Sequence, residues 1–458
     1  MLDRIPEEVR WAAQVLRAAG YQAFLVGGAL RDGLLGLAPK DWDLATDARP
    51  QQVAALFEER GRRVVPTGVR FGTVTVLFER LALEITTFRA EGQYRDYRRP
   101  DYVRFGASLV EDLARRDFTV NALALNLATG RLVDPFGGRR DLEARRIRTV
   151  GRPAERFRED PLRMLRGFRL AAERGFRLDG EVRLAAAVHG DLLGRVAGER
   201  IREELARLLT GPWAVPTLHE LAGTGLAFVL IPELKAGWAF PLPCFSTPRT
   251  LFDHLAETVR YTPPFVPLRL AAFLHDVAKP YCFARGPDGS VRFYGHDRLG
   301  AELAGTILRR LRWDHRTCET VSLLVRHHMF PLMMGDRGIR RLVLRVGAER
   351  VEYLLALRQA DLLATGPEAA VQAEPALVLF RTRLREILEK GEALSVRDLA
   401  VDGHDVMRLL GIGPGPEVGR ILRRLHEEVL ADPSRNDRPY LEARILDLRG
   451  RNSLPAGE

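Results

Sequence analysis

The sequence predicts an α+β protein in which a small mixed α/β head precedes a largely helical remainder. The first 145 residues alternate short apolar runs with helical stretches, which is typical of a sheet covered by helices. From residue 146 onward, apolar residues recur at helical spacing, and only a short hairpin is expected, at 282–294. A chain of 458 residues also exceeds one ordinary domain, since domains average about 100–200 residues.

The elements expected in the head are a strand over 21–26, a helix over 51–60, and strands over 73–78 and 81–86. The later helices are expected over 161–173, 181–193, 201–209, 250–260, 268–275, 298–311, 318–327, 349–363 and 375–389. Proline in 240–250 predicts a linker, and 366–374 is a weaker candidate. We therefore expect a head (1–145), a helical neck and body (146–239), a third helical domain (240–370) and a helical tail (371–458).

Charge and cysteine usage narrow the functional class. The net charge of +10 and the sequence pI of about 9.9 favour a polyanionic partner such as nucleic acid. Only four of the 70 basic residues are lysines, so an arginine-rich genome is an alternative explanation. The apolar runs are far shorter than the roughly 18 residues that cross a bilayer, and we expect no membrane association. Three widely spaced cysteines indicate a reducing, cytoplasmic location.

A candidate phosphate loop follows the first strand of the head. The strand over 21–26 leads into Gly27-Gly28, and a helix is expected over 29–35. Glycines let the backbone approach a phosphate closely, and a helix N-terminus offers free N–H groups. The same pattern also makes an ordinary tight turn.

Paired carboxylates follow this loop. On an extended strand Asp41 and Asp43 point to the same face, where they repel each other unless a cation lies between them. Mg²⁺ suits such a site, because it binds one or two carboxylates together with substrate phosphates. A solvent-facing turn is the alternative. Glu84, on the strand over 81–86, would complete a three-carboxylate site or else point to water at a sheet edge.

Arginines dominate two further parts of the head. Arg115-Arg116 precede an apolar segment, where guanidinium groups would hold phosphate or form structural ion pairs. The segment 88–105 mixes arginine with tyrosine and is too polar for a core. We interpret it as a loop near a polyanion, with Arg95, Arg98 and Arg99 as candidate RNA contacts.

An ordered set of short motifs resembles the class II tRNA nucleotidyltransferases, the family of bacterial CCA-adding enzymes and poly(A) polymerases. The motifs are Gly27–Asp32 with Asp41–Thr46, Arg115–Ala122, Asp134–Gly138, Glu159–Arg166 and Glu199–Leu205. The resemblance implies a polymerase-β-like nucleotidyltransferase head acting on tRNA with ATP and CTP. It also implies that Asp41 and Asp43 hold two Mg²⁺ ions, with Glu84 as a third catalytic carboxylate. The RNA 3′-hydroxyl would then attack the nucleotide α-phosphate and release pyrophosphate.

The same resemblance implies roles for other residues. The nucleotide-binding candidates are Gly27, Gly28, Arg31, Arg115, Asp117, Asn121, Asp160, Arg163 and Arg166. Asp160 and Arg163 stand three apart, on one face of the expected helix, and would read the base of C or A. Because Asp160 precedes Pro161, it would alternatively be a helix N-cap. Arg200 and Arg202 are candidate RNA contacts.

Three alternatives to CCA addition remain. In the family that the motifs resemble, CC-only members lack a loop between the first two motifs, so the loop at 91–103 argues against a CC-only enzyme. It does not separate CCA addition from A-only addition or poly(A) synthesis. A phosphohydrolase with an RNA-binding head would be an enzyme of another class, and a non-catalytic RNA-binding protein is the third alternative. The intact Asp41/Asp43 pair argues against both of these.

The third domain carries histidines and aspartates in metal-ligand order. His254, His275-Asp276 and Asp361 resemble the HD phosphohydrolase superfamily. Such a ligand set suits Mn²⁺, Ni²⁺, Fe²⁺ or Zn²⁺. His296 and the His327-His328 pair are further candidates for a second metal or for phosphate, with His327 taken as the ligand. A degenerate domain serving as an RNA platform is the alternative.

Overall fold

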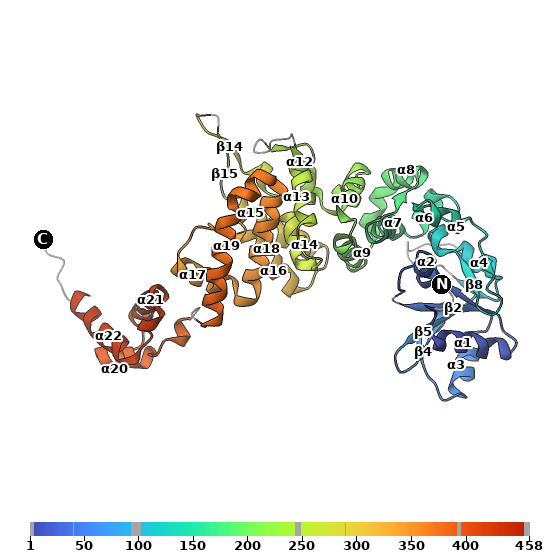
Figure 1. The fold of residues 1–458 in the computed structure, drawn as a ribbon, viewed down its shortest axis with the longest axis horizontal. Coiled ribbons are helices and arrows are strands. Elements are labelled where there is room, and N and C mark those ends of the chain that lie inside the picture. Colours follow the sequence, from blue (N-terminus) through green and yellow to red (C-terminus); the bar gives the residue numbers. More distant parts are fainter. Residues whose placement is uncertain are drawn as a thin grey trace. The chain divides into compact units, whose positions relative to one another are not determined.

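The structure is a computed structural model that describes residues 4–39, 41–92, 102–242, 249–288, 290–391 and 395–452. The chain forms two compact units, Met1–Lys235 with Arg310–Arg312, and Ala236–Arg309 with Trp313–Glu458. Each unit has its own core, and each is described separately (Figure 1). Among the described residues, no helix is both long and apolar enough to cross a membrane.

The first unit begins with a seven-stranded sheet in the order β3-β4-β5-β2-β1-β8-β9. Its strands are β1 (Ala23–Val26), β2 (Trp42–Thr46), β3 (Arg63–Gly68), β4 (Thr73–Leu77), β5 (Ala82–Thr87), β8 (Ala124–Asn126) and β9 (Leu132–Val133). β2 and β5 pair in parallel, whereas the other neighbours are antiparallel. The helices α1 (Glu7–Ala18) and α3 (Pro50–Glu58) contact each other and the sheet. The expected strands and helix of the head are therefore present.

The connections around this sheet carry the site residues. They are α2 (Gly27–Leu34), β6 (Arg89–Glu91), β7 (Val103–Phe105), α4 (Leu109–Ala114), the 3₁₀ turn Thr119–Asn121, α5 (Gly138–Glu143) and β10 (Arg146–Ile147). β1 ends at the glycine pair and is fully buried, as a central strand of a mixed sheet requires. The stretch after residue 118 holds a 3₁₀ turn before its short strand, so little of this apolar segment is extended.

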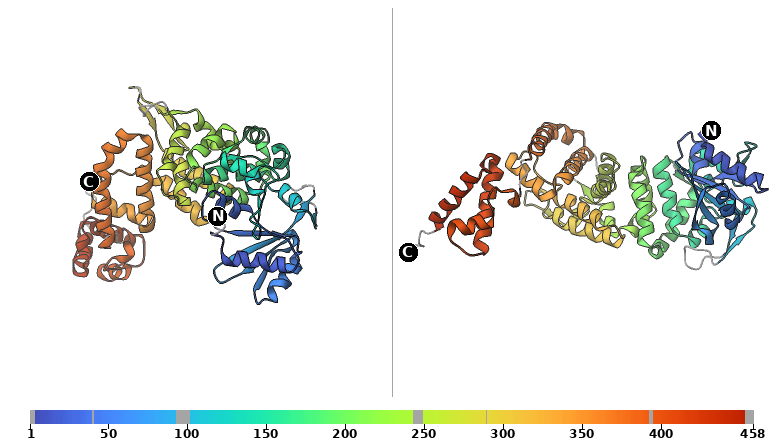
Figure 2. Two further views of the ribbon diagram at one scale, coloured as in Figure 1. Left: turned by 45° about the vertical axis from the view of Figure 1, so that its right-hand side comes forward. Right: turned by 90° about the horizontal axis from the view of Figure 1, so that it is seen from below.

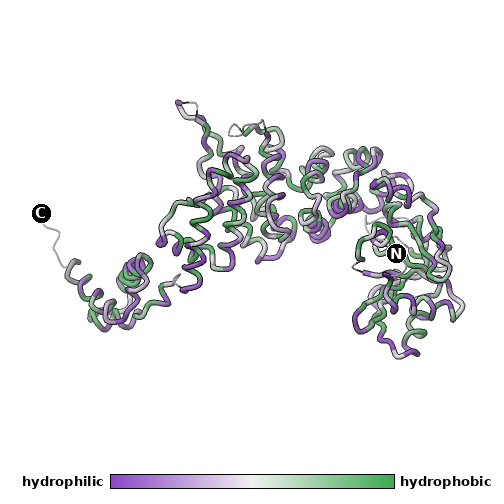
Figure 3. The backbone as a smooth tube through the Cα atoms, in the orientation of Figure 1, coloured by the Kyte–Doolittle hydropathy of each residue, from purple (hydrophilic) through white to green (hydrophobic). Residues whose placement is uncertain are grey.

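The rest of the first unit is helical. The helices are α6 (Pro153–Glu159), α7 (Leu162–Arg174), α8 (Gly180–His189), α9 (Gly198–Thr210), α10 (Ala214–Gly223) and α11 (Leu226–Leu230), with β11 (Arg177–Leu178) between α7 and α8. α7 packs against α9 and ends at Gly175, whose φ of +68° is the left-handed conformation that favours glycine. Along these helices polar and apolar residues alternate, since each buries one face (Figure 3).

The second unit is a helical assembly with a small hairpin. It contains α12 (Lys235–Trp238), β12 (Pro241–Leu242), β13 (Arg249–Thr250), α13 (Leu251–Arg260), α14 (Val266–Leu274), β14 (Phe283–Arg285), β15 (Val291–Phe293), α15 (His296–Arg310), α16 (His315–His327), α17 (Asp336–Val346), α18 (Ala348–Thr365) and α19 (Pro367–Glu389). α18 contacts α13, α14, α16, α17 and α19 and is therefore the central helix of this unit. Two further views of the chain show the mainly helical character of its second half (Figure 2). The expected hairpin is present as β14 and β15.

The tail comprises α20 (Gly403–Leu410), α21 (Pro416–Ala431) and α22 (Arg438–Asn452). These helices enclose an apolar cluster that includes Val406, Leu425 and Leu441. α20 begins with a capping box in which Asp402 accepts hydrogen bonds from the backbone N–H groups of His404 and Asp405. The tail is thus a small core of its own within the second unit.

Candidate active site and metal centre

A cavity of about 790 Å³ in the first unit brings together the residues that the motifs single out. The predicted residues that line it are Gly27, Gly28, Arg31, Asp41, Asp43, Glu84, Arg115, Asp117, Asn121, Asp160, Arg163, Arg166 and Arg200. Arg202 does not line it and instead donates a hydrogen bond to the carbonyl of Arg312 at 2.7 Å. Arg95, Arg98 and Arg99 lie outside the described residues.

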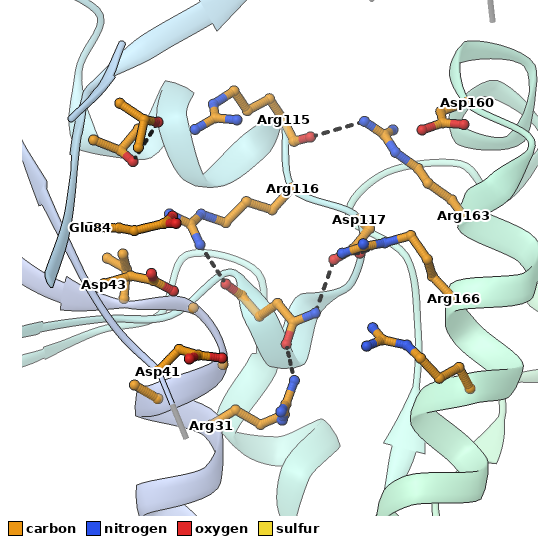
Figure 4. Close-up of a pocket in the computed structure, with 18 of the residues that line it drawn as sticks. Arg31, Asp41, Asp43, Glu84, Arg115, Arg116, Asp117, Asp160, Arg163 and Arg166 are labelled. Carbon is orange, nitrogen blue, oxygen red and sulfur yellow. Dashed lines mark hydrogen bonds and ion pairs between the residues drawn. The ribbon is translucent and has the colours of Figure 1, made fainter. Parts of the chain in front are cut away.

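Three carboxylates stand together on one wall of the cavity (Figure 4). Asp43 on β2 is directly opposite Glu84 on β5, because the two strands pair in parallel with these residues in register. Asp41 precedes β2 by one residue. Burial, Glu84 and Asp41 raise the pKa of Asp43 to about 6 against the opposing effect of the Arg116 guanidinium. Three carboxylates on one wall, of which Asp43 is partly buried beside the other two, form a set of oxygen donors that suits a divalent cation.

Gly27 allows the first strand to approach these carboxylates. Its φ is +73°, and a Cβ placed there would lie 2.9 Å from Oδ2 of Asp43. α2 begins at this residue, so its first backbone N–H groups are next to the carboxylate wall. Gly27 is therefore required both by its backbone conformation and by the close approach of Asp43.

A hydrogen-bonded chain of side chains crosses the floor of the cavity. Arg31 donates to Asn121 Oδ1 at 2.8 Å, and Asn121 Nδ2 donates to Asp117 Oδ1 at 3.0 Å. Arg166 Nε donates to the other oxygen of Asp117 at 2.9 Å. Burial alone would raise the pKa of Asp117, but Arg166 and Asn121 outweigh it and hold that pKa far below its usual range. The chain thus links α2, the 3₁₀ turn and α7 around a permanently ionised carboxylate.

Arg115 and Arg116 point to different partners. Arg115 pairs with Asp112 at 2.8 Å and with Glu91 at 3.1 Å. Arg116 also contacts Asp112, at 3.4 Å, but its guanidinium is the one that acts electrostatically on Asp43. Arg116 lines the cavity but was not among the predicted nucleotide contacts, although the motif Arg115-Arg116 contained it.

The helix expected to carry both Asp160 and Arg163 begins later than predicted. α7 starts at Leu162, and Asp160 has extended backbone angles, so the two residues do not share a helix face. Asp160 Oδ1 accepts a hydrogen bond from the backbone N–H of Leu162, as the capping alternative requires. The prediction of one shared face is therefore wrong, because Pro161 separates α6 from α7.

Asp160 and Arg163 nevertheless both line the cavity, opposite the carboxylates (Figure 4). Arg200, expected to contact RNA, forms a two-pronged ion pair with Asp160, with N–O distances of 2.7 and 3.2 Å. Arg163 donates to Glu159 at 2.6 Å and to the carbonyl of Arg115 at 3.3 Å. The partners of these two side chains could not be read from the sequence, since they come from other turns and helices.

The second unit holds a buried cluster of four histidines and two aspartates. One set of ligand atoms comes from His254, His275, Asp276 and Asp361, and a second set comes from Asp276, His296 and His328. Within the first set His254 Nε2 lies 3.2 Å from both His275 Nε2 and Asp361 Oδ1. Asp276 therefore belongs to both sets and would bridge two cations.

The orientation of the imidazole rings favours metal binding. The Nδ1 atoms of His275, His296 and His328 lie within 2.9 Å of backbone carbonyl oxygens, so each Nε2 is turned toward the cluster. Within the described residues, His296 Nε2, His328 Nε2 and Asp276 Oδ1 are buried and have no hydrogen-bond partner. Because each Nδ1 donates to a carbonyl oxygen, each Nε2 is an acceptor, and three buried acceptors that face one another without a donor fit a cation between them.

The expectation that His327 is a ligand is wrong. Successive residues in a helix are rotated by about 100°, and α16 turns His328 into the cluster and His327 away from it. His327 instead lines a separate groove with Arg326 and Met329. His254, His275, Asp276, His296 and Asp361 all lie in the cluster.

Comparisons with known proteins identify the family. Three family models match, a poly A polymerase head domain at residues 23–148, a probable RNA and SrmB-binding site of polymerase A at 175–237, and an HD domain at 254–366. A CCA-adding enzyme of Levilactobacillus brevis is 34% identical over 455 residues, covering 97% of this chain and all of the relative. The chain belongs to the family of CCA-adding enzymes. A CCA-adding enzyme of Enterococcus faecalis is 46% identical over 453 residues, with 96% of each chain covered.

A solved structure agrees with this assignment. The CCA-adding enzyme of Bacillus stearothermophilus in complex with CTP is 28% identical and superposes with a TM-score of 0.73, covering 97% of both chains. The chain is therefore a tRNA nucleotidyltransferase with an attached HD domain. The predicted fold class, a mixed nucleotidyltransferase head followed by helical parts, is confirmed. The division into four regions and the roles of single residues stay predictions.

Proposed function

We propose that the cavity of the first unit adds C and A from CTP and ATP to the 3′ end of tRNA, in the cytoplasm, without a template. The observation that supports this proposal is the convergence of Asp41, Asp43 and Glu84 on the same cavity as Asp160 and Arg163. Carboxylates on one wall would hold the cations that bind the reacting phosphates, and a polar pair on the opposite wall suits the base of the incoming nucleotide.

The three carboxylates would hold Mg²⁺. The bound ions would lower the pKa of the RNA 3′-hydroxyl and neutralise charge on the triphosphate. Gly27 and Gly28 line the cavity at the N-terminus of α2, where backbone N–H groups favour phosphate oxygens. Arg116 lies beside this wall and adds positive charge toward the same oxygens. The hydroxyl attacks the α-phosphate in line, and pyrophosphate leaves without a covalent enzyme intermediate.

Base selection would fall to Asp160 and Arg163. Asp160 can accept a hydrogen bond from the exocyclic amine that C and A share, and Arg163 can donate to a ring nitrogen or carbonyl. U and G present the opposite donors and acceptors at these positions, so they would leave the pair unmatched. Arg200 fixes the orientation of the Asp160 carboxylate before a nucleotide binds.

Three transcripts of one tRNA, ending before CCA, after C and after CC, test the proposal. Growth of the shortest by three nucleotides, requiring both CTP and ATP, is the expected result. Growth only of the CC-ended transcript with ATP would identify an A-adding enzyme, and long A tails would identify a poly(A) polymerase. Asp41→Asn should abolish addition, while Glu58→Gln, on the exposed face of α3, should leave it intact.

A second activity is favoured by the paired ligand sets in the second unit. The two sets that share Asp276 would hold a pair of divalent ions such as Mn²⁺, Ni²⁺ or Zn²⁺ and hydrolyse a phosphate ester. Lys279 contacts Asp276 and offers a cation to the substrate phosphate. Phosphate release from nucleoside monophosphates and cyclic nucleotides with each metal tests this. Asp276→Asn should lose both metal and activity, and His315→Ala, an exposed histidine on α16, should lose neither.

A further inference from the structure

An exposed aromatic surface surrounds the hairpin of the second unit. We name the aromatic hairpin as residues 281–288 and 290–294, which contain β14 and β15 (Figure 1). Tyr281, Phe283 and Tyr294 expose 56%, 45% and 68% of their surface. Three aromatic side chains this exposed within one short hairpin indicate a binding surface, since scattered single exposures are the norm.

The base of the aromatic hairpin is held by its own packing. Phe283 is opposite Phe293 in the antiparallel register, and Phe240 packs edge-on against both at ring distances of 5.8 and 6.2 Å. This cluster accounts for the partial burial of Phe293 and gives the two strands a fixed base. It does not include Tyr281 or Tyr294, which flank the strands and stay exposed.

The charge of this surface is positive. Arg285 and Arg292 are exposed on the strands, and the Arg292 guanidinium lies 5.9 Å from the ring centre of Tyr294 while donating to its hydroxyl. Asp297 is neutralised by Arg326 at 2.7 Å, whereas Asp288 keeps its charge while it accepts from Ser290 in the turn, so the two arginines exceed the one uncompensated carboxylate of the aromatic hairpin. Guanidinium groups beside exposed rings are the combination that binds phosphates and stacks bases.

Both ends of the aromatic hairpin lead directly to the metal-ligand cluster. On the first side Lys279 contacts Asp276 and lies 5.4 Å from the ring centre of Phe293. On the second side Tyr294 is two residues before His296, whose Nε2 is 3.4 Å from Asp276. A strand bound along the aromatic hairpin would therefore have its end at the cluster.

We propose that the aromatic hairpin is a binding surface for a single-stranded RNA end, stacking bases on Tyr281 and Tyr294 and holding phosphates with Arg285 and Arg292. An acidic protein would use the arginines but has no need of two flanking tyrosines, and a second copy of this chain would bring like charge to a positive surface. Presentation of the RNA end to the cluster rests on the hydrolytic activity proposed above. Binding of RNA to the aromatic hairpin does not depend on that activity.

The test uses the full-length protein and a single-stranded RNA of about ten nucleotides that ends in CCA and carries 4-thiouridine near its 3′ end. Ultraviolet cross-linking followed by peptide mapping should place cross-links within residues 281–298. The double variant Tyr281→Ala/Tyr294→Ala should reduce these cross-links at least about fivefold, because each stacked base contributes that much or more. Arg285→Gln/Arg292→Gln should weaken them and flatten their salt dependence. The matched control is Tyr261→Ala, which removes a tyrosine that is 43% exposed at the C-terminal end of α13 in the same unit.

Metal content and nucleotide addition by the double variant should match those of wild type, which shows that both sites are folded. Cross-links confined to the first unit, or unchanged in the double variant, would overturn the proposal. A concentration-dependent dimer that only the wild-type protein forms would also overturn it, by assigning the aromatic surface to self-association. If wild type releases no phosphate from any substrate but cross-links as expected, the hydrolytic proposal fails and RNA binding stands.

Discussion

Replacing Asp43 with Asn should stabilise the metal-free head while abolishing nucleotide addition. Burial, Glu84 and Asp41 raise the pKa of Asp43 from 3.8 to about 6. The folded state therefore binds this proton more tightly than the unfolded chain does, and ionisation costs stability as pH rises. Above pH 6 the full cost is present, and the rise of this pKa from 3.8 to about 6 corresponds to about 3 kcal/mol of unfolding free energy. Asparagine has nearly the same shape and no charge to bury.

The size of the effect depends on pH in a defined way. At pH 4.5 Asp43 is mostly protonated in the folded state, so the advantage of Asn over Asp should fall to about 1 kcal/mol. Saturating Mg²⁺ should stabilise the wild type by neutralising the carboxylates and should stabilise Asp43→Asn much less. Asp43→Asn should thus increase stability and abolish activity, as expected for a site whose negative charges serve to bind a cation.

Hydrogen exchange of the β2 and β5 amides reads the stability of the head without interference from the second unit. We would compare wild type, Asp43→Asn and the control Asp47→Asn in EDTA at pH 7.5 and 4.5, correcting for intrinsic exchange rates. Equal protection of wild type and Asp43→Asn at pH 7.5, or an advantage for Asn that does not shrink at pH 4.5, would refute the electrostatic account.

Three further predictions concern single contacts. Arg200→Gln should lower the ratio of kcat/KM for CTP over UTP by about tenfold, because Asp160 loses the ion pair that orients it, and an unchanged ratio would exclude that role. Gly27→Ala should lower the head's melting temperature and its addition rate more than Gly36→Ala. Both glycines have positive φ, but only Gly27 approaches Asp43. Equal effects of the two substitutions would mean that backbone strain alone explains the loss. His328→Ala should lose about one metal ion per chain by elemental analysis, whereas His327→Ala should lose none, and the reverse result would restore His327 as a ligand.

The head was predictable because its chemistry lies close in sequence and its strands are plainly apolar. Asp41 and Asp43 are two residues apart and both line the cavity, although Asp41 lies just before β2 and not on the strand as the spacing predicted. Glu84 was harder, because nothing in its own strand reveals that β5 pairs in parallel with β2. The register between two strands is set by the pairing of the whole sheet, which the local sequence pattern of one strand does not reveal.

Partners across helices could not be predicted. Asp160 and Arg200 are 40 residues apart and meet because α7 packs against α9, an outcome of packing that spacing does not encode. His327 and His328 were indistinguishable in the sequence, since the choice depends on where α16 ends and which way its last turn faces. A shift of one residue in a helix boundary decides which of two adjacent histidines is buried.

Both sites gather partly or fully buried carboxylates whose negative charge has to be compensated by a cation, and they differ in the residues beside those carboxylates. In the head, carboxylates face one another with Arg116 as a nearby cation, so the excess charge is negative and a hard, oxygen-preferring ion fits. In the second unit, burial lowers the pKa of His275, but Asp276 and Asp361 outweigh it and raise that pKa to about 10, so a proton takes the place that a softer cation would hold. A proton can substitute for the metal only in the histidine site at neutral pH. Removal of metal ions by a chelator should therefore lower the stability of the head more than that of the second unit. Acidification to pH 5 should reverse this loss of stability in the head alone, because Asp43 is then protonated.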